Sequence, residues 1–235
     1  LNCYLREFAL PAGQVEWQAG GDLPKALTSS LLAGEALRLT LPASKIKLAL
    51  KADRVSLLGR ARFSSAPFIK RFGQPWRLLP AMEACRLLLQ EMALQTGTPY
   101  NRELDEQIAN STGITHAFLS HTRATQADSL LESEQALIWG HPMHPSPKSR
   151  HGVPTDELLA CSPEVGADFP LCWFRVDKSL WQHRGEPAAI TMLEQLAGAP
   201  GLYPCHPWEV HHILASPLYR KAEQGGLIAY LGPLG

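Results

Sequence analysis

The apolar residues between about positions 36 and 62 alternate with polar ones. Turn-forming residues at 42–44 and 52–54 divide this stretch into three short runs. Alternation with short turns between the runs predicts an antiparallel meander with one apolar face. The apolar positions are Leu37, Leu39, Leu41, Ile46, Leu48, Leu50, Val55 and Leu57. The other face carries Lys45, Lys47 and Lys51, which we expect to be solvated.

From residue 78 onward the apolar spacing becomes that of helices. Steps of four and three residues predict a helix over about 78–94 that ends before Gly97. Its stripe consists of Leu78, Met82, Cys85, Leu89 and Met92. A second helix is expected over about 101–121, with a weak point at 111–113. Asp128 can cap a third helix. The apolar face of that helix would be Leu130, Leu131, Leu137 and Ile138.

Shorter elements are expected at both ends of the chain. They are a helix end at 1–9, a strand at 14–18, a helix near 156–159, a strand at 169–176, a helix at about 187–197 and a last helix after His206. The pattern therefore predicts an α+β protein. We expect a helical lobe with a small antiparallel β-meander at 1–155, followed by the start of a second α+β subdomain at 156–235.

Composition narrows the class of protein. The chain has 235 residues, of which 45% are hydrophobic, so a substantial core is expected. Its 22 basic and 22 acidic residues balance, which argues against a nucleic-acid partner. No apolar run reaches the roughly 18 residues of a membrane span, and no signal peptide is visible. Five cysteines without a CxxC pair suit reduced thiols. We therefore expect a cytoplasmic protein without a membrane partner.

The ends of the sequence also carry an expectation. The chain begins with Leu1 rather than Met and stops shortly after a Leu-Gly-Pro stretch at 231–233. Both ends look cut, so we expect these residues to be part of a longer protein.

The stretch Gly140–Gly152, which we call the His-Pro loop, carries the candidate chemistry. Five of the eleven residues from 141 to 151 are His, Lys or Arg, and no acid occurs between Glu134 and Asp156. Three prolines at 142, 145 and 147 restrict the backbone, so the donors lose less entropy when they order around a ligand. The loop is therefore interpreted as a site for an anion with several negative charges. Its candidate ligand-binding residues are His141, His144, Lys148 and Arg150.

Other interpretations of the loop stay open. It could be a proline-rich surface loop with incidental basic residues. A metal site made of His141, His144 and His151 lacks a nearby carboxylate or thiolate, and Lys148 and Arg150 would repel a cation, so no metal ligand is assigned. A nucleic-acid site would need more positive charge and interleaved aromatic residues.

A second cluster occupies 203–212 and contains three histidines. Pro207 suits the first turn of a helix, with His206 near its cap. His206 is therefore a further candidate binding residue. An equally good alternative is a buried structural turn with Trp208 in the core.

These residues resemble the NRPS-independent siderophore synthetases of the IucA/IucC family. The family signature, Gly-His-Pro-x-His-Pro-x-x-Lys-x-Arg-x-Gly, is complete from Gly140 to Gly152. Supporting similarities are Asn2 with Leu5-Arg6-Glu7, Glu134, Ser162-Pro163-Glu164 and the run Tyr203–Trp208. Two departures are Glu209, where the family has Gln, and Cys161-Ser162, where the family has an aromatic residue.

The resemblance implies an enzyme that activates a carboxylate, typically of citrate, with ATP and Mg²⁺. An acyl adenylate forms, and an amine or hydroxyl then displaces AMP. By the same analogy His144, Lys148 and Arg150 bind carboxylate or phosphate oxygens, while His141 and Gly140 shape the turn or add one contact. No general base is assigned.

The resemblance also implies what these residues lack. The magnesium ligands and a nucleotide-contacting Ser-x-Arg-Thr element would lie in a C-terminal part, so we expect the 235 residues alone to be inactive. Family members are often dimers, so a homodimer is an expectation too. The alternative function is a non-catalytic module that binds citrate or nucleotide, or that mediates assembly.

Overall fold

The computed structural model describes residues 1–17, 21–29, 34–56, 60–121, 129–182, 184–186 and 188–233. The chain forms two compact units, Leu1–Gly166 and Ala167–Gly235. Each unit combines helices with antiparallel strands, which confirms the α+β class. The division falls later than the expected boundary at 155/156, because helix α6 (Thr155–Cys161) packs its leucines into the first unit.

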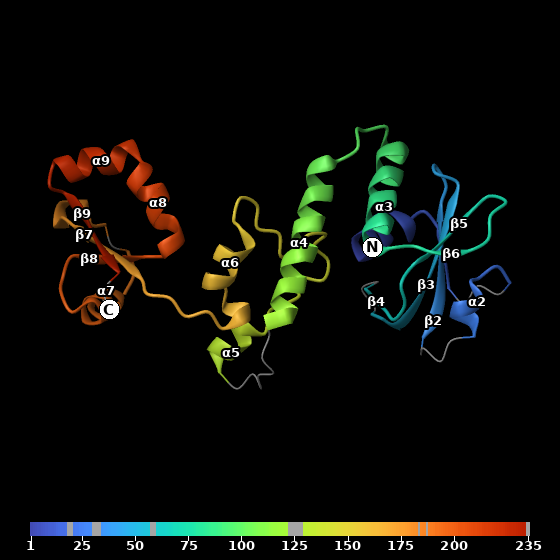
Figure 1. Cartoon of the computed structure of the whole chain (residues 1–235), viewed down its shortest axis with the longest axis horizontal. Helices are drawn as coiled ribbons and strands as arrows, with labels where there is room; N and C mark the ends of the chain where they lie inside the picture. Colours follow the sequence, from blue (N-terminus) through green and yellow to red (C-terminus); the bar gives the residue numbers. More distant parts are fainter. Residues whose placement is uncertain are drawn as a thin grey trace. The chain divides into compact units, whose positions relative to one another are not determined.

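A six-stranded antiparallel sheet organises the first unit (Figure 1). Its strands are β1 (Val15–Trp17), β2 (Glu35–Leu41), β3 (Ile46–Val55), β4 (Ala61–Phe63), β5 (Phe68–Arg71) and β6 (Arg77–Leu78). The order is β1-β2-β3-β5-β6, and β4 also pairs with β3. Leu37, Leu39 and Leu41 lie opposite Leu50, Leu48 and Ile46, and all six are buried. The predicted meander and its apolar face are therefore confirmed.

Two details of the meander were predicted wrongly. The turn expected at 52–54 does not exist, because β3 continues to Val55 and absorbs a register shift between Ala52 and Arg54. Strands β5 and β6 were not anticipated, because they are short and carry no alternating pattern. Leu57 lies outside the described residues.

The polar face of the sheet is only partly solvated. Lys45 is exposed, but Lys51 is 9% exposed. The chain at 64–65 lies against Lys51: the backbone N–H of Ser64 donates to the carbonyl oxygen of Lys51, and the N–H of Lys51 donates to Oγ of Ser65. Figure 1 shows helix α2 (Lys25–Thr28) on the side of the sheet away from α3. The expectation of a fully solvated lysine face is therefore wrong at Lys51.

The apolar face of the sheet packs against the N-terminal helical turns and helix α3. These are α1 (Asn2–Tyr4), the π-helical turn η1 (Leu5–Ala9) and α3 (Ala81–Thr96). Tyr4, Leu5 and Leu88 join the strand leucines in one core. α3 begins after Pro80, so Leu78 belongs to β6 rather than to the expected helix stripe. Gly97 ends α3 at φ +66°, as the sequence indicated.

Further helices complete the first unit. They are α4 (Arg102–His121), α5 (Leu130–Gln135), α6 and the short 3₁₀ turn η2 (Pro163–Val165). α4 is continuous, so the weak point expected at 111–113 is wrong. Asp128 lies outside the described residues, and Ser129 caps α5 through a capping box with Glu132. Of the apolar face expected for this helix, Ile138 is buried, whereas Leu130, Leu131 and Leu137 are exposed.

The second unit is a three-stranded sheet covered by helices (Figure 1). Its elements are β7 (Cys172–Val176), η3 (Lys178–Leu180), α7 (Ala188–Ala197), β8 (Leu202–Cys205), α8 (Pro207–Ala215), α9 (Pro217–Gln224) and β9 (Ile228–Pro233). The strand order is β8-β7-β9, and both pairs are antiparallel. Phe174 lies at the centre of the core, where its ring contacts Tyr219 and Tyr230.

Two findings concern the described part of the chain as a whole. None of its helices combines the length and the apolarity that a membrane crossing requires. All five cysteines are free thiols.

Candidate functional site

The His-Pro loop follows α5 and is folded tightly on itself at its start. Gly140 has φ +65°, a conformation that residues with a Cβ rarely adopt. A Cβ at this position would lie 2.9 Å from Cβ of Pro147 and 3.4 Å from Cε of Lys148. Gly140 is therefore required both by the backbone conformation and by close packing, which fits its expected role in shaping the turn.

Lys148 forms a buried ion pair that the sequence did not reveal. Its Nζ donates to Oε1 of Glu164 over 2.6 Å, and the two side chains are 7% and 9% exposed. The same Nζ lies 5.8 Å from the ring centroid of Phe118. Lys148 belongs to the loop signature and Glu164 to the Ser162-Pro163-Glu164 element, which are two separate similarities to the family. The ion pair brings these two elements together. In this structure the ammonium group of Lys148 is therefore buried against Glu164 and is not presented to solvent.

Helix α4 anchors the loop through polar side chains. The backbone N–H of Lys148 donates to Oγ of Ser111 over 3.0 Å. The backbone N–H of Arg150 and the hydroxyl of Ser149 both donate to Oδ1 of Asn110, over 2.8 and 3.1 Å. Asn110 and Ser111 were missed in the sequence, where they look like ordinary polar positions of a helix. They fix the backbone on both sides of Ser149.

The N-terminal turn anchors the other end of the loop. The thiol of Cys3 donates to the carbonyl oxygen of Met143 over 3.0 Å. Asn2, beside it, exchanges hydrogen bonds of 3.0 and 2.9 Å with the backbone of Ala61 in β4. The N-terminal helix that resembles the family thus connects the loop to the sheet.

Both His-Pro steps of the loop form the same local turn. Nδ1 of His141 accepts from the backbone N–H of Met143 over 3.3 Å, and Nδ1 of His144 accepts from Ser146 over 3.1 Å. Because Nδ1 accepts in each ring, the neutral imidazole carries its proton on Nε2. Both side chains are exposed, so each presents an Nε2–H donor to solvent.

Arg150 is the third exposed donor of the loop. Its Nη1 donates to the carbonyl oxygen of its neighbour Ser149 over 3.0 Å. Among the residues that the structure describes, no carboxylate forms an ion pair with it. The guanidinium can therefore offer its remaining N–H groups to a carboxylate or phosphate.

His206 lies in the second unit and caps helix α8. Its Nδ1 accepts from the backbone N–H of Trp208 over 3.1 Å, and Phe169 contacts its ring edge-on at 4.6 Å. The predicted placement of His206 at the cap and of Pro207 in the first turn is confirmed. Trp208 is 37% exposed, so the alternative that places it in the core is wrong.

The thiol beside His206 is not activated. Burial raises the pKa of Cys205, and the carboxylate of Glu209 and the nearby Cys172 raise it further. A raised pKa lowers the thiolate fraction, so Cys205 has the character of a core residue rather than of a nucleophile.

Metal ligands do not gather in the described part of the chain. There, no three His, Cys, Asp or Glu side chains lie close enough together to hold an ion. The exposed groups of the His-Pro loop are hydrogen-bond donors and the guanidinium of Arg150, which suit anionic oxygen atoms.

The fold and the loop together define a class: an α+β protein whose loop presents exposed N–H donors, which suit an anion. Comparison with known proteins finds relatives for this fold. Residues 129–235 match the model of the IucA / IucC family. The protein named rhizobactin siderophore biosynthesis protein RhbC, from Rhizobium meliloti, is 35% identical over 46% of this chain and 21% of its own length. The spermidine-citrate ligase of Bacillus anthracis is 23% identical over 100% of this chain and 44% of its own length.

A solved structure shares the fold of the entire chain. It is that of the aerobactin synthetase IucA from Klebsiella pneumoniae, with a TM-score of 0.78 and 21% identity. The match covers 100% of this chain and 43% of the solved one. The chain therefore matches the IucA / IucC family over residues 129–235 and shares the fold of one solved synthetase. It spans less than half the length of these relatives.

Proposed function

We propose that the chain is the N-terminal part of an ATP-dependent ligase of siderophore biosynthesis. The enzyme would join a citrate-like carboxylate to an amine or hydroxyl. The names of the relatives support this proposal, since they include a spermidine-citrate ligase and the L-2,3-diaminopropanoate–citrate ligase of Staphylococcus aureus. A structure of the ATP-bound aerobactin synthetase IucA shares the fold, which supports ATP as the co-substrate.

One observation carries the proposal: His141, His144 and Arg150 present N–H donors from a loop whose backbone is held at both ends. Citrate and ATP are both polyanions, and fixed donors lower the cost of bringing two such anions together. In this proposal the two Nε2–H groups and the guanidinium bind carboxylate or phosphate oxygens. Lys148 holds the loop through Glu164, which replaces the direct contact expected from the sequence.

The reaction would follow two steps. Attack of the carboxylate on the α-phosphate of ATP forms an acyl adenylate and releases pyrophosphate, and the amine or hydroxyl then displaces AMP. Mg²⁺ would neutralise phosphate charge, and its acidic ligands are expected outside these 235 residues. A homodimer and a cytoplasmic location remain predictions.

Pyrophosphate exchange with citrate in the complete enzyme tests the proposal. Changing Arg150 to Ala should lower the rate by about a hundredfold or more, because an oxyanion-binding donor contributes on that scale. The exposed Arg184 in the second unit provides a control, and Arg184→Ala should leave the rate unchanged. An Arg150→Ala enzyme with near-normal exchange would remove the loop from the site.

The same assay separates the enzyme from the alternative, a binding module. We expect the 235-residue chain to bind ATP or citrate without catalysing exchange. A complete protein that binds citrate but never exchanges pyrophosphate would favour the binding module.

A further inference from the structure

A second cationic site lies in the first unit, on the polar face of its sheet. Here the start of β3, the end of β5 and the loop after β5 surround a hollow of about 840 Å³. We call it the lysine hollow. Its charged lining residues are Asp22, Lys45, Lys47, Lys70 and Arg71. Phe72, which is fully exposed, and residues 73–74 complete the lining.

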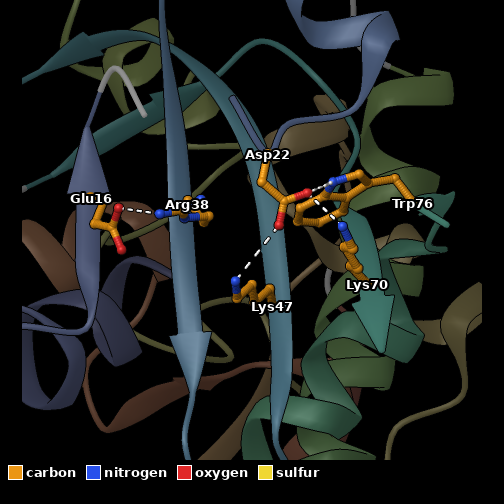
Figure 2. Close-up of polar contacts among 6 residues, drawn as sticks. All are labelled: Glu16, Asp22, Arg38, Lys47, Lys70 and Trp76. Atoms are coloured by element: carbon orange, nitrogen blue, oxygen red, sulfur yellow. Dashed lines mark hydrogen bonds and ion pairs between the residues drawn. The ribbon is translucent and has the colours of Figure 1, made fainter. Parts of the chain in front are cut away.

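The hollow concentrates positive charge that its own carboxylate does not balance. Lys47 and Lys70 lie directly opposite each other in the β3–β5 register, an arrangement in which like charges repel. Asp22 accepts from Lys70 over 2.6 Å and lies 3.6 Å from Lys47 (Figure 2). The indole of Trp76 donates to the same Asp22 oxygen as Lys70 does. The lining of the hollow thus holds four cations and one carboxylate, which pairs with two of them.

The two outer cations have no acidic partner among the described residues. No ion pair joins Lys45 or Arg71 to a carboxylate there, whereas Arg38 on the same sheet pairs with Glu16. Figure 2 shows Glu16 turned to Arg38, and Asp22 between Lys47 and Lys70. The sheet therefore pairs its inner cations with carboxylates only in part, and it leaves the rim of the hollow positive.

The backbone that carries Lys45 is held in a costly conformation. Among the described residues, Lys45 is the only one other than glycine with a positive φ, at +56°. The fully buried carboxylate of Glu91 fixes the preceding turn, since it accepts from the backbone N–H groups of Ala43 and Ser44 over 2.8 and 2.7 Å. A strained residue held by a buried anchor is typical of a preorganised site.

We propose that the lysine hollow binds a small polyanion that carries two or more carboxylate or phosphate groups. The site is separate from the His-Pro loop. The hollow lies on the polar face of the sheet, whereas the loop is hydrogen-bonded to Cys3 of the N-terminal turn, which packs on the apolar face. The formal charge of the chain is zero, so the positive charge is local and suits a small ligand better than a nucleic-acid backbone.

Backbone amide shifts in an NMR titration of the 235-residue chain test the proposal. Citrate and tripolyphosphate serve as probes, one for each kind of anionic group. The variant Lys45→Gln/Arg71→Gln removes the two cations that have no partner, so the network of Asp22 remains. The control variant Arg184→Gln/Lys221→Gln removes one arginine and one lysine from exposed positions of the second unit.

The expected result is a saturable shift of amides at 44–47 and 70–74 with at least one probe. It should weaken at least about tenfold in Lys45→Gln/Arg71→Gln and stay unchanged in the control. The probe that gives saturable shifts indicates whether the site prefers carboxylate or phosphate groups. Absence of these shifts with both probes up to millimolar concentration, or equal affinity in the variant with both cations removed, would overturn the proposal. Arg150→Gln should leave these shifts unchanged, so the proposal for the lysine hollow and the proposal for the His-Pro loop are tested independently.

Discussion

At the scale of single residues, the buried carboxylate of Glu91 joins helix α3 to the turn between β2 and β3. It is fully buried and accepts from the backbone of Ala43 and Ser44, from the hydroxyl of Ser44 and from Nε2 of Gln95. Glu91→Gln replaces an acceptor oxygen with a donor, so it should lower the free energy of unfolding by about 2 kcal/mol. Glu83→Gln, an exposed change in the same helix, should cost almost nothing. Urea denaturation measures both.

The same carboxylate should make stability depend on pH. Desolvation of Glu91 raises its pKa, but the hydrogen bonds from Ser44, Gln95 and Ala43 outweigh this, so the pKa is lowered from 4.5. A lowered pKa means that this stabilisation is complete above the unfolded value near 4.5 and is lost as the pH falls through the folded value. The stability gap between wild type and Glu91→Gln should therefore shrink below about pH 4.5. A gap that is constant from pH 7 to pH 3 would contradict this assignment.

The ion pair of Lys148 and Glu164 gives a second prediction at this scale. Removing one partner leaves a buried charge without compensation, so Lys148→Met should lower the free energy of unfolding by about 3–5 kcal/mol. The double variant Lys148→Met/Glu164→Leu removes both charges and should recover most of that loss. A double variant as unstable as the single one would show that the pair does not hold the loop.

This pair also shows where sequence reasoning ends. The basic residues of the loop were recognisable because no acid is close to them in sequence. Glu164 is 16 residues further along the chain and reaches Lys148 only because α6 and η2 pack onto α4. Tertiary packing, not local pattern, decided that Lys148 has a partner while His141 and His144 stay exposed.

At the scale of elements, the start of the His-Pro loop depends on Gly140. Gly140→Ala combines the unfavourable positive φ with a contact of 2.9 Å to Pro147, and should cost about 2–4 kcal/mol of unfolding free energy. Gly152 is the matched control, since it also has a positive φ, of +81°, but nothing lies within 4 Å of a Cβ there. Gly152→Ala should cost only about 1 kcal/mol. Equal costs for the two variants, measured by urea denaturation, would show that packing at Gly140 is unimportant.

The spacing of apolar residues predicted a strand or helix well where one face of that element is buried, and poorly where it is not. The leucines of β2 and β3 alternate because their face forms the core, so the meander was predictable. The prediction of a turn at 52–54 was wrong, because these polar residues lie inside strand β3, at its register shift. The prediction of a buried apolar face on α5 was also wrong, since Leu130 and Leu131 are exposed.

At the scale of the whole chain, the two units have separate cores. Among the described residues, the core around Phe174 consists of residues of the second unit, including Tyr219 and Tyr230. Phe174→Ala should therefore accelerate amide hydrogen exchange throughout 172–233 and leave residues 1–166 unchanged. Mass spectrometry of exchanged peptides measures this. Faster exchange in β2 and β3 as well would contradict the division at Gly166.

The central claim is that the exposed donors of the His-Pro loop bind a polyanion. The most direct test is an NMR titration of the 235-residue chain with ATP and with citrate, followed at the amides of residues 140–152. The account predicts saturable shifts there that weaken at least about tenfold in Arg150→Gln and persist in Arg184→Gln. Loop amides that do not respond to either ligand, or that respond equally in Arg150→Gln, would contradict it.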